Sequence, residues 1–150
     1  MLFNRTKKLT RKTVRINAAT ASLTEKDHGN KVVSLGVATL QTLTLPKAKG
    51  DGLTISVYMP ITATGNKVIK VIDSVDVFQG GSLTLPSAGG AVNYFAAVAG
   101  TSDTLTFNGT TTGGIRGTEV VFTSLAAGVW DVKVLAVCSG TVATPFSATV

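Results

Sequence analysis

The sequence predicts an all-β protein: a single compact antiparallel domain, either a β-sandwich or barrel-like, with an extended basic N-terminal arm. Three observations support this prediction. Thr and Val, both β-branched, are the most abundant of the 150 residues, and such side chains favour strands. Short strand-like runs recur along the chain, separated by Gly, Pro, Asn or Asp. No segment longer than one turn has the 3.6-residue periodicity of a helix.

The strand-like runs are spread over almost the whole chain, as expected for a sandwich, barrel or compact β-roll. They lie at 13–17, 31–35, 39–45, 53–58, 67–71, 82–85, 92–97, 104–107, 119–123, 129–137 and 145–149.

One pattern occurs twice. Leu43-Thr44-Leu45-Pro46 precedes a short turn and the strand-like run 53–58, and Leu83-Thr84-Leu85-Pro86 precedes a glycine turn and the run 92–95. Proline cannot donate to a strand ladder and therefore ends the first run of each pair. Two copies are too few for a solenoid, so the pattern predicts two hairpin-like units within one domain.

The C-terminal third shows the clearest alternation. In the run 129–134, Trp130, Val132 and Val134 share one face, and Asp131 and Lys133 share the other. Trp130 is expected to anchor the core. We also expect three further aromatic residues to anchor the core or an oligomer contact: Tyr94, Phe95 and Phe146.

The formal net charge of +6 comes from the N-terminal end of the chain. Six cations and no acid precede Ile16, whereas the eight later cations are balanced by eight acids. The sequence is therefore divided into a basic arm, residues 1–18, and a neutral β body, residues 19–150. The arm's cations are the candidate binding residues: Arg5, Lys7, Lys8, Arg11, Lys12 and Arg15.

Several uses of the arm remain open. Its cations suit an acidic protein surface or nucleic-acid phosphates, and a solvated tail without a partner is the plain alternative. A general nucleic-acid-binding domain is disfavoured because the arm lacks interleaved aromatics other than Phe3. Its basic, acid-free composition also fits a mitochondrial presequence, but the period-two pattern of residues 13–17 favours a strand.

The body is unusually apolar. Charged residues make up 15% of the chain, below the usual share of about 25%, and the mean hydropathy is +0.34. The uncharged stretch 77–102 is long enough to cross a bilayer, but its Gly and Pro residues indicate strands and turns. We expect this apolar surface to be buried by self-association or by docking on a larger assembly.

Reactive groups are scarce, and the sequence predicts no enzyme, cofactor or metal site. The single histidine, His28, lies in a polar, turn-like stretch, and one histidine cannot build a multi-histidine metal centre. The single cysteine, Cys138, excludes an intrachain disulfide and is expected to be a buried thiol. No phosphate-binding or dinucleotide fingerprint occurs.

Several segments resemble small virion proteins of bacteriophages. They are Leu23 to Val33 with its Asp-His-Gly-Asn-Lys core, Leu43 to Pro46 with the following glycine turn, 108–117, 126–130 and 143–147. The likeness covers residues 23–150 in patches and resembles the head decoration, or cement, proteins of tailed phages.

The resemblance implies a structural protein on the outer capsid surface of a virion, made in the host cytoplasm. Its implied partners are the major capsid protein and further copies of itself, commonly as a trimer. The sequence itself predicts no small-molecule substrate and no membrane, and it disfavours nucleic acid as a partner. The role of the arm is inferred from its charge alone. The alternative function is a fibre or knob module that binds a receptor or glycan, for which one Trp and two Tyr offer few stacking platforms.

Overall fold

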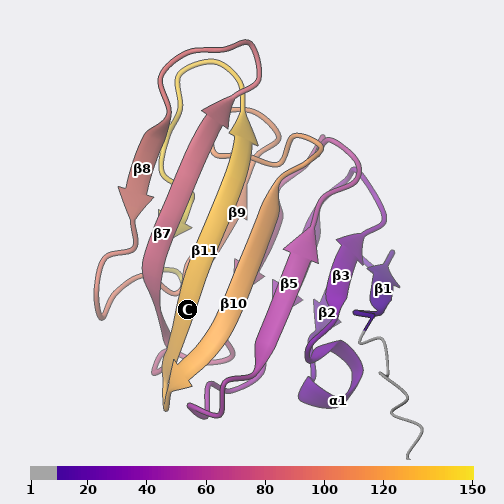
Figure 1. The fold of residues 1–150 in the computed structure, drawn as a ribbon, viewed down its shortest axis with the longest axis vertical. Coiled ribbons are helices and arrows are strands. Elements are labelled where there is room, and N and C mark those ends of the chain that lie inside the picture. Colours follow the sequence, from indigo (N-terminus) through magenta and orange to yellow (C-terminus); the bar gives the residue numbers. More distant parts are fainter. Residues whose placement is uncertain (1–9) are drawn as a thin grey trace, which may run out of the picture.

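The computed structural model describes residues 10–150, which form a two-layer β-sandwich (Figure 1). The front sheet has seven strands, in the order β1 (Thr13–Ile16), β3 (Val32–Leu35), β5 (Thr54–Tyr58), β10 (Glu119–Ala126), β11 (Val129–Cys138), β7 (Val77–Pro86) and β8 (Asn93–Ala96). The back sheet has five, in the order β12 (Phe146–Ser147), β9 (Thr104–Phe107), β6 (Lys67–Lys70), β4 (Gln41–Thr44) and β2 (Thr20–Ser22). The predicted all-β sandwich is confirmed.

Both sheets are mixed, so the expected antiparallel pairing holds for only part of each ladder. Antiparallel pairs join β5 to β10, β10 to β11, β7 to β8, β6 to β9 and β9 to β12. Parallel pairs join β1 to β3, β3 to β5, β2 to β4, β4 to β6 and β11 to β7. Four of the five parallel pairs, all except β11–β7, arise because the first seven strands alternate between the two sheets.

This alternation makes residues 13–70 a flattened coil of three turns. Each turn places one strand in the front sheet (β1, β3, β5) and the next in the back sheet (β2, β4, β6). The predicted hairpin-like unit from Leu43 to Tyr58 is therefore wrong: β4 and β5 lie in different sheets. The second unit, from Leu83 to Phe95, does form the antiparallel pair β7–β8.

The core lies between the sheets and takes alternate side chains from each strand. Along β11, Trp130, Val132 and Val134 are buried, whereas Lys133 is exposed. Phe122 contacts Trp130 edge-to-face, with ring centroids 6.5 Å apart, and stacks at a tilt on Phe78, 5.7 Å away. Trp130 is thus a core residue, as predicted.

The C-terminal end of the chain contributes two further predicted core groups. Phe146 on β12 is 9% exposed and belongs to the core cluster. Cys138 at the end of β11 is a buried free thiol, and burial raises its pKa. A raised pKa keeps the thiol protonated and unreactive at neutral pH.

The helical content of residues 10–150 is one short element, α1 (Glu25–His28), where the sequence indicates only a polar turn. Thr24 is its N-cap: its hydroxyl accepts a hydrogen bond from the Asp27 N–H (3.1 Å) and donates to the Asp27 carboxylate (3.0 Å). The Thr24 N–H donates to His28 Nδ1 and not to Asp27, so the reciprocal bond of a capping box is absent. No helix in the described part of the chain has the length and apolarity to cross a membrane.

The basic arm is shorter than the sequence indicates. Thr13–Ile16 form β1, which pairs in parallel with β3 and buries Ile16. Residues from Thr13 onward are therefore part of the sandwich, and the boundary placed at residue 18 falls after its first strand. Arg5, Lys7 and Lys8 lie outside the described residues.

A buried lysine organises the loops that join the first strands. The Lys67 side chain is 1% exposed, and its ammonium donates to the carbonyls of Val37 (2.7 Å) and Thr39 and to Gln41 Oε1 (3.1 Å). The Gln41 amide in turn donates to the carbonyls of Ile16 and Ala18, both at 3.0 Å. All its acceptors are neutral, and burial lowers the pKa of Lys67.

We expect Lys67→Met to lower the free energy of unfolding at neutral pH by about 1–3 kcal/mol, because buried acceptors lose their donor. The loss should grow as the pH rises from the lowered pKa of folded Lys67 towards the ordinary lysine pKa. Between these two values the unfolded wild-type chain holds more protons than the folded chain, so the wild type gains stability with pH and the variant does not. Urea unfolding of both proteins at several pH values measures this difference. An unfolding free-energy difference that is independent of pH would contradict it.

Candidate interaction surface

Among residues 10–150, no helix or further strand covers the outer face of the seven-stranded front sheet (Figure 1). Its strands are in register, so one row of Cα partners crosses all seven. From the β1 edge to the β8 edge this row reads Arg15, Ser34, Tyr58, Glu119, Leu135, Leu83 and Tyr94. The row is charged or polar at one end and apolar at the other.

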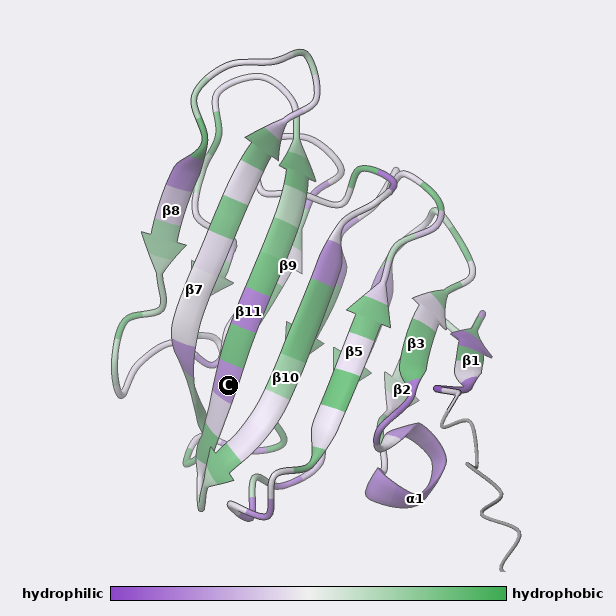
Figure 2. Ribbon diagram, in the orientation of Figure 1, coloured by the Kyte–Doolittle hydropathy of each residue, from purple (hydrophilic) through white to green (hydrophobic). Residues whose placement is uncertain are grey.

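The apolar end lies over β11, β7 and β8. Leu83, Leu135 and Tyr94 are 44%, 41% and 61% exposed, and Figure 2 shows hydrophobic residues along these strands. Two shallow hollows meet there and share Leu83, Lys133 and Val134 in their walls. Clustered exposed apolar side chains on a sheet mark a surface suited to protein contact.

Tyr94 lines one of these hollows. A side chain at Gly81 would place its Cβ 2.3 Å from the Tyr94 hydroxyl oxygen, so the tyrosine ring lies directly across the glycine. Asp131 and Lys133, an ion pair at 2.9 Å, line the same hollow. The result is an exposed aromatic ring beside one acid and one base.

The β1 edge carries the described cations of the arm. Arg11 donates to the Ser56 hydroxyl (3.2 Å), which ties the chain before β1 to β5. Arg15 donates to the Asn17 side chain (3.1 Å) and to the Gly36 carbonyl (3.0 Å). Among residues 10–150, no carboxylate oxygen lies within 4 Å of the charged groups of Arg11, Lys12 or Arg15. Their positive charge is therefore available to an acidic partner.

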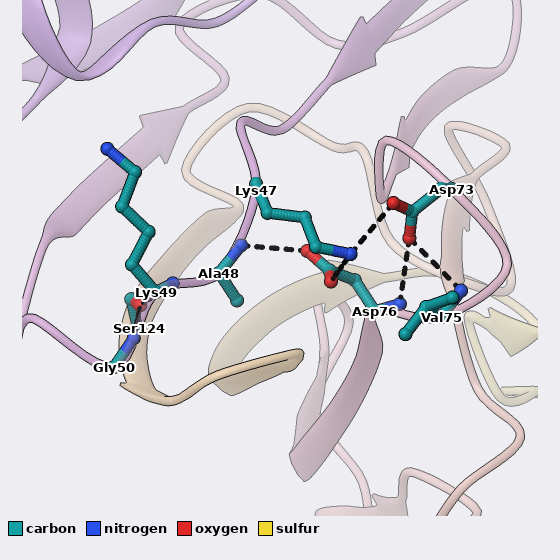
Figure 3. Close-up of polar contacts among 8 residues, drawn as sticks. All are labelled: Lys47, Ala48, Lys49, Gly50, Asp73, Val75, Asp76 and Ser124. Carbon is teal, nitrogen blue, oxygen red and sulfur yellow. Dashed lines mark hydrogen bonds and ion pairs between the residues drawn. The ribbon is translucent and has the colours of Figure 1, made fainter.

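A polar cluster at the crossings before β5 and β7 has a structural role (Figure 3). The buried Asp76 carboxylate pairs with the Lys47 ammonium (2.7 Å) and accepts from the Ala48 N–H (2.7 Å). Asp73 also pairs with Lys47 (2.8 Å) and accepts from the Val75 and Asp76 N–H groups (both 3.0 Å). These hydrogen bonds hold the pKa of Asp73 below and that of Lys47 above their ordinary values.

Ser124 supports the same loop. Its hydroxyl accepts from the Lys49 N–H (3.0 Å) and from the Gly50 N–H (2.8 Å), as Figure 3 shows. The cluster thereby fixes the 45–53 crossing between the sheets to the 71–76 loop and to β10. Its groups are engaged with one another and with the backbone, which assigns them to the fold.

His28 is likewise engaged in local structure. Its Nδ1 accepts a hydrogen bond from the Thr24 N–H at 2.9 Å, within the cap of α1. In residues 10–150 no three His, Cys, Asp or Glu side chains come together in a way that could hold a metal ion.

The predicted anchors divide between the core and the outer face. Trp130 and Phe146 are buried, Phe95 is half-buried on the inner side of β8, and Tyr94 is exposed. Sequence reasoning missed Tyr58, Leu83 and Leu135. Their signal was present in the alternation, since each lies one position away from buried neighbours on its strand.

Comparison with known proteins adds no assignment: no family model matches the sequence, and neither a curated protein nor a solved structure matches it.

Proposed function

We propose that this protein is a non-enzymatic structural component of a phage virion that decorates the outer capsid surface and stabilises the shell by binding major capsid protein subunits. The observation that carries the proposal is the outer face of the front sheet. Within residues 10–150, it combines exposed apolar side chains with cations that have no carboxylate partner. The resemblance described above supplies the kind of partner and a homotrimer as the expected assembly.

The mechanism needs only surface chemistry. Apolar burial contributes about 25 cal/mol per Å² before the costs of association, and the cations guide the protein onto an acidic shell. Because the protein binds the assembled shell, mass action then shifts the shell towards its intact state.

Co-sedimentation with undecorated capsids tests the proposal, using wild type, Leu135→Asp and the control Leu40→Asp. Leu135 lies in the apolar part of the face, and Leu40 is similarly exposed (55%) in the loop before β4. We expect Leu135→Asp to weaken attachment roughly ten- to a hundredfold, matching about 1.5–3 kcal/mol of lost leucine burial. Leu40→Asp should bind as wild type does.

The wild-type protein should also raise the temperature at which capsids release their contents. Failure of the wild type to co-sediment with any capsid, or equal attachment by both Asp variants, would count against the proposal.

One observation favours the alternative, a glycan- or receptor-binding knob. The Tyr94 ring is 61% exposed and lies beside the Asp131–Lys133 pair, and aromatic rings flanked by polar groups suit small polar ligands. Binding to a glycan array that is lost in Tyr94→Ala, without capsid attachment, would favour this alternative over decoration.

A further inference from the structure

The two sheets have four edges, and three of them are poor sites for strand addition. β2 and β12, the edges of the back sheet, are three and two residues long. β1, one edge of the front sheet, carries Arg15 and follows Arg11 and Lys12. Very short strands and charged side chains are the devices that block pairing at sheet edges.

The fourth edge, β8, has neither device. The chain carries no charged residue from Val77 to Ser102, and β8 itself contains no proline. Three apolar side chains on and beside this strand are among the most exposed in the described chain: Val92 (56%), Tyr94 (61%) and Val98 (62%). Figure 1 shows no described element beyond β8 on that side. An uncharged, apolar edge of this kind is a template for pairing with another strand.

The backbone of β8 is oriented for this pairing. The Ala97 N–H donates to the Gly80 carbonyl (3.0 Å), which continues the β7–β8 ladder by one hydrogen-bonded pair. Because such pairs alternate along an antiparallel ladder, the N–H and C=O groups of Tyr94 and Ala96 point away from β7. They form the open row of donors and acceptors that a further strand would use.

We propose that a second copy of this chain docks on the β8 edge, so that this edge faces the symmetry axis of the homo-oligomer. Identical residues meet near the axis of a symmetric assembly. At the axis, a charged edge would face the same charges on the second copy and be repelled, as Arg15 would be if β1 lay there. The uncharged β8 edge faces its copy without this repulsion. Because β8 has no charge with which to attract a charged partner, we assign contact with the shell to the cationic β1 edge. This inference rests on the self-association in the proposed function and names its contact.

The mass of the full-length protein in solution tests the inference, with no capsid present. We expect wild type to sediment as an oligomer of the 15.4 kDa chain. Tyr94→Lys and Val98→Lys should each raise the concentration at which half the chains are associated, roughly tenfold or more, because they place like charges at the axis. The control Val75→Lys adds the same charge at a 70% exposed apolar residue before β7 and should leave the mass unchanged.

The fully buried Trp130 reports the fold of each variant through its fluorescence. Val98 lies outside the β8 ladder, so Val98→Lys decides the question if Tyr94→Lys does not fold. A monomeric wild type, or folded lysine variants that keep the wild-type mass, would overturn the inference. Capsid co-sedimentation is measured separately, so a protein that binds shells without associating through β8 loses this inference and keeps the proposed function.

Discussion

Replacing Trp130 with alanine should lower the free energy of unfolding by about 3–5 kcal/mol, the range for truncating a large buried aromatic side chain. The indole is 0% exposed and meets Phe122 edge-to-face. It also lies in register with Phe78 on β7 and Ser124 on β10, the two strands that flank β11. Alanine would leave a cavity in the core between the two sheets, beside Phe122.

Trp130→Phe is the matched control. The Trp130 Nε1 is buried without a hydrogen-bond partner among the described residues, so the indole N–H contributes nothing to offset its loss of water. Phenylalanine removes that unsatisfied donor and keeps most of the ring, so its cost should be well below that of alanine.

Urea unfolding followed by far-UV circular dichroism measures both variants, since the fluorescent group is the one removed. Equal destabilisation by alanine and phenylalanine would show that the indole N–H, and not the ring volume, supports the core. A loss below about 1 kcal/mol for Trp130→Ala would contradict the central packing role assigned to this residue.

The strands and their faces could be predicted because a strand with one face in the core carries buried, mostly apolar residues at every second position. In β11 the buried Trp130 and Val132 and the outward Asp131 and Lys133 follow the predicted alternation. The glycine turn at 126–128 does connect an antiparallel pair, and Gly128 has a φ of 75°, a conformation that glycine adopts without strain.

Strand pairing could not be predicted in the same way. A strand whose neighbour in sequence lies in the opposite sheet shows the same alternation as one in a hairpin, since both have one face in the core. The turns of the coil in residues 13–70 also share little sequence beyond this alternation, and the Leu-Thr-Leu-Pro echo marks a sheet crossing after β4 but a hairpin after β7. The parallel ladders therefore became visible only in three dimensions.

The sequence predicted where the positive charge of the candidate surface lies, but not where its exposed apolar side chains come together. The distribution of Lys and Arg placed the cations at the N-terminal end, and the structure brings Arg11 and Arg15 to the β1 edge of the front sheet. The apolar end could not be located, because Leu83, Leu135 and Tyr94 become neighbours only through the register of β11, β7 and β8.

The same geometry decides how the basic arm should be tested. Deleting residues 1–15 would remove most of β1 and expose the edge of β3, so reduced attachment could reflect a damaged sheet. Replacing Arg5, Lys7 and Lys8 with serine removes half of the arm's cations and leaves β1 intact. The matched control replaces Lys26, Lys70 and Arg116 with serine, which lowers the net charge by the same amount in the body.

We expect the arm variant to bind capsids about 0.6–3 kcal/mol more weakly, roughly a three- to 150-fold loss of affinity, because each of three exposed ion pairs contributes about 0.2–1 kcal/mol. Its attachment should also depend less steeply on salt, since fewer charges remain to be screened. The body variant should lose less affinity, because Lys70 on β6 and Arg116 in the loop before β10 lie away from the edge that the arm extends. Co-sedimentation across a salt series measures both quantities. If the two variants lose equal affinity and share one salt slope, overall charge rather than the arm attracts the shell, and the contact assigned to the β1 end of the front sheet is wrong.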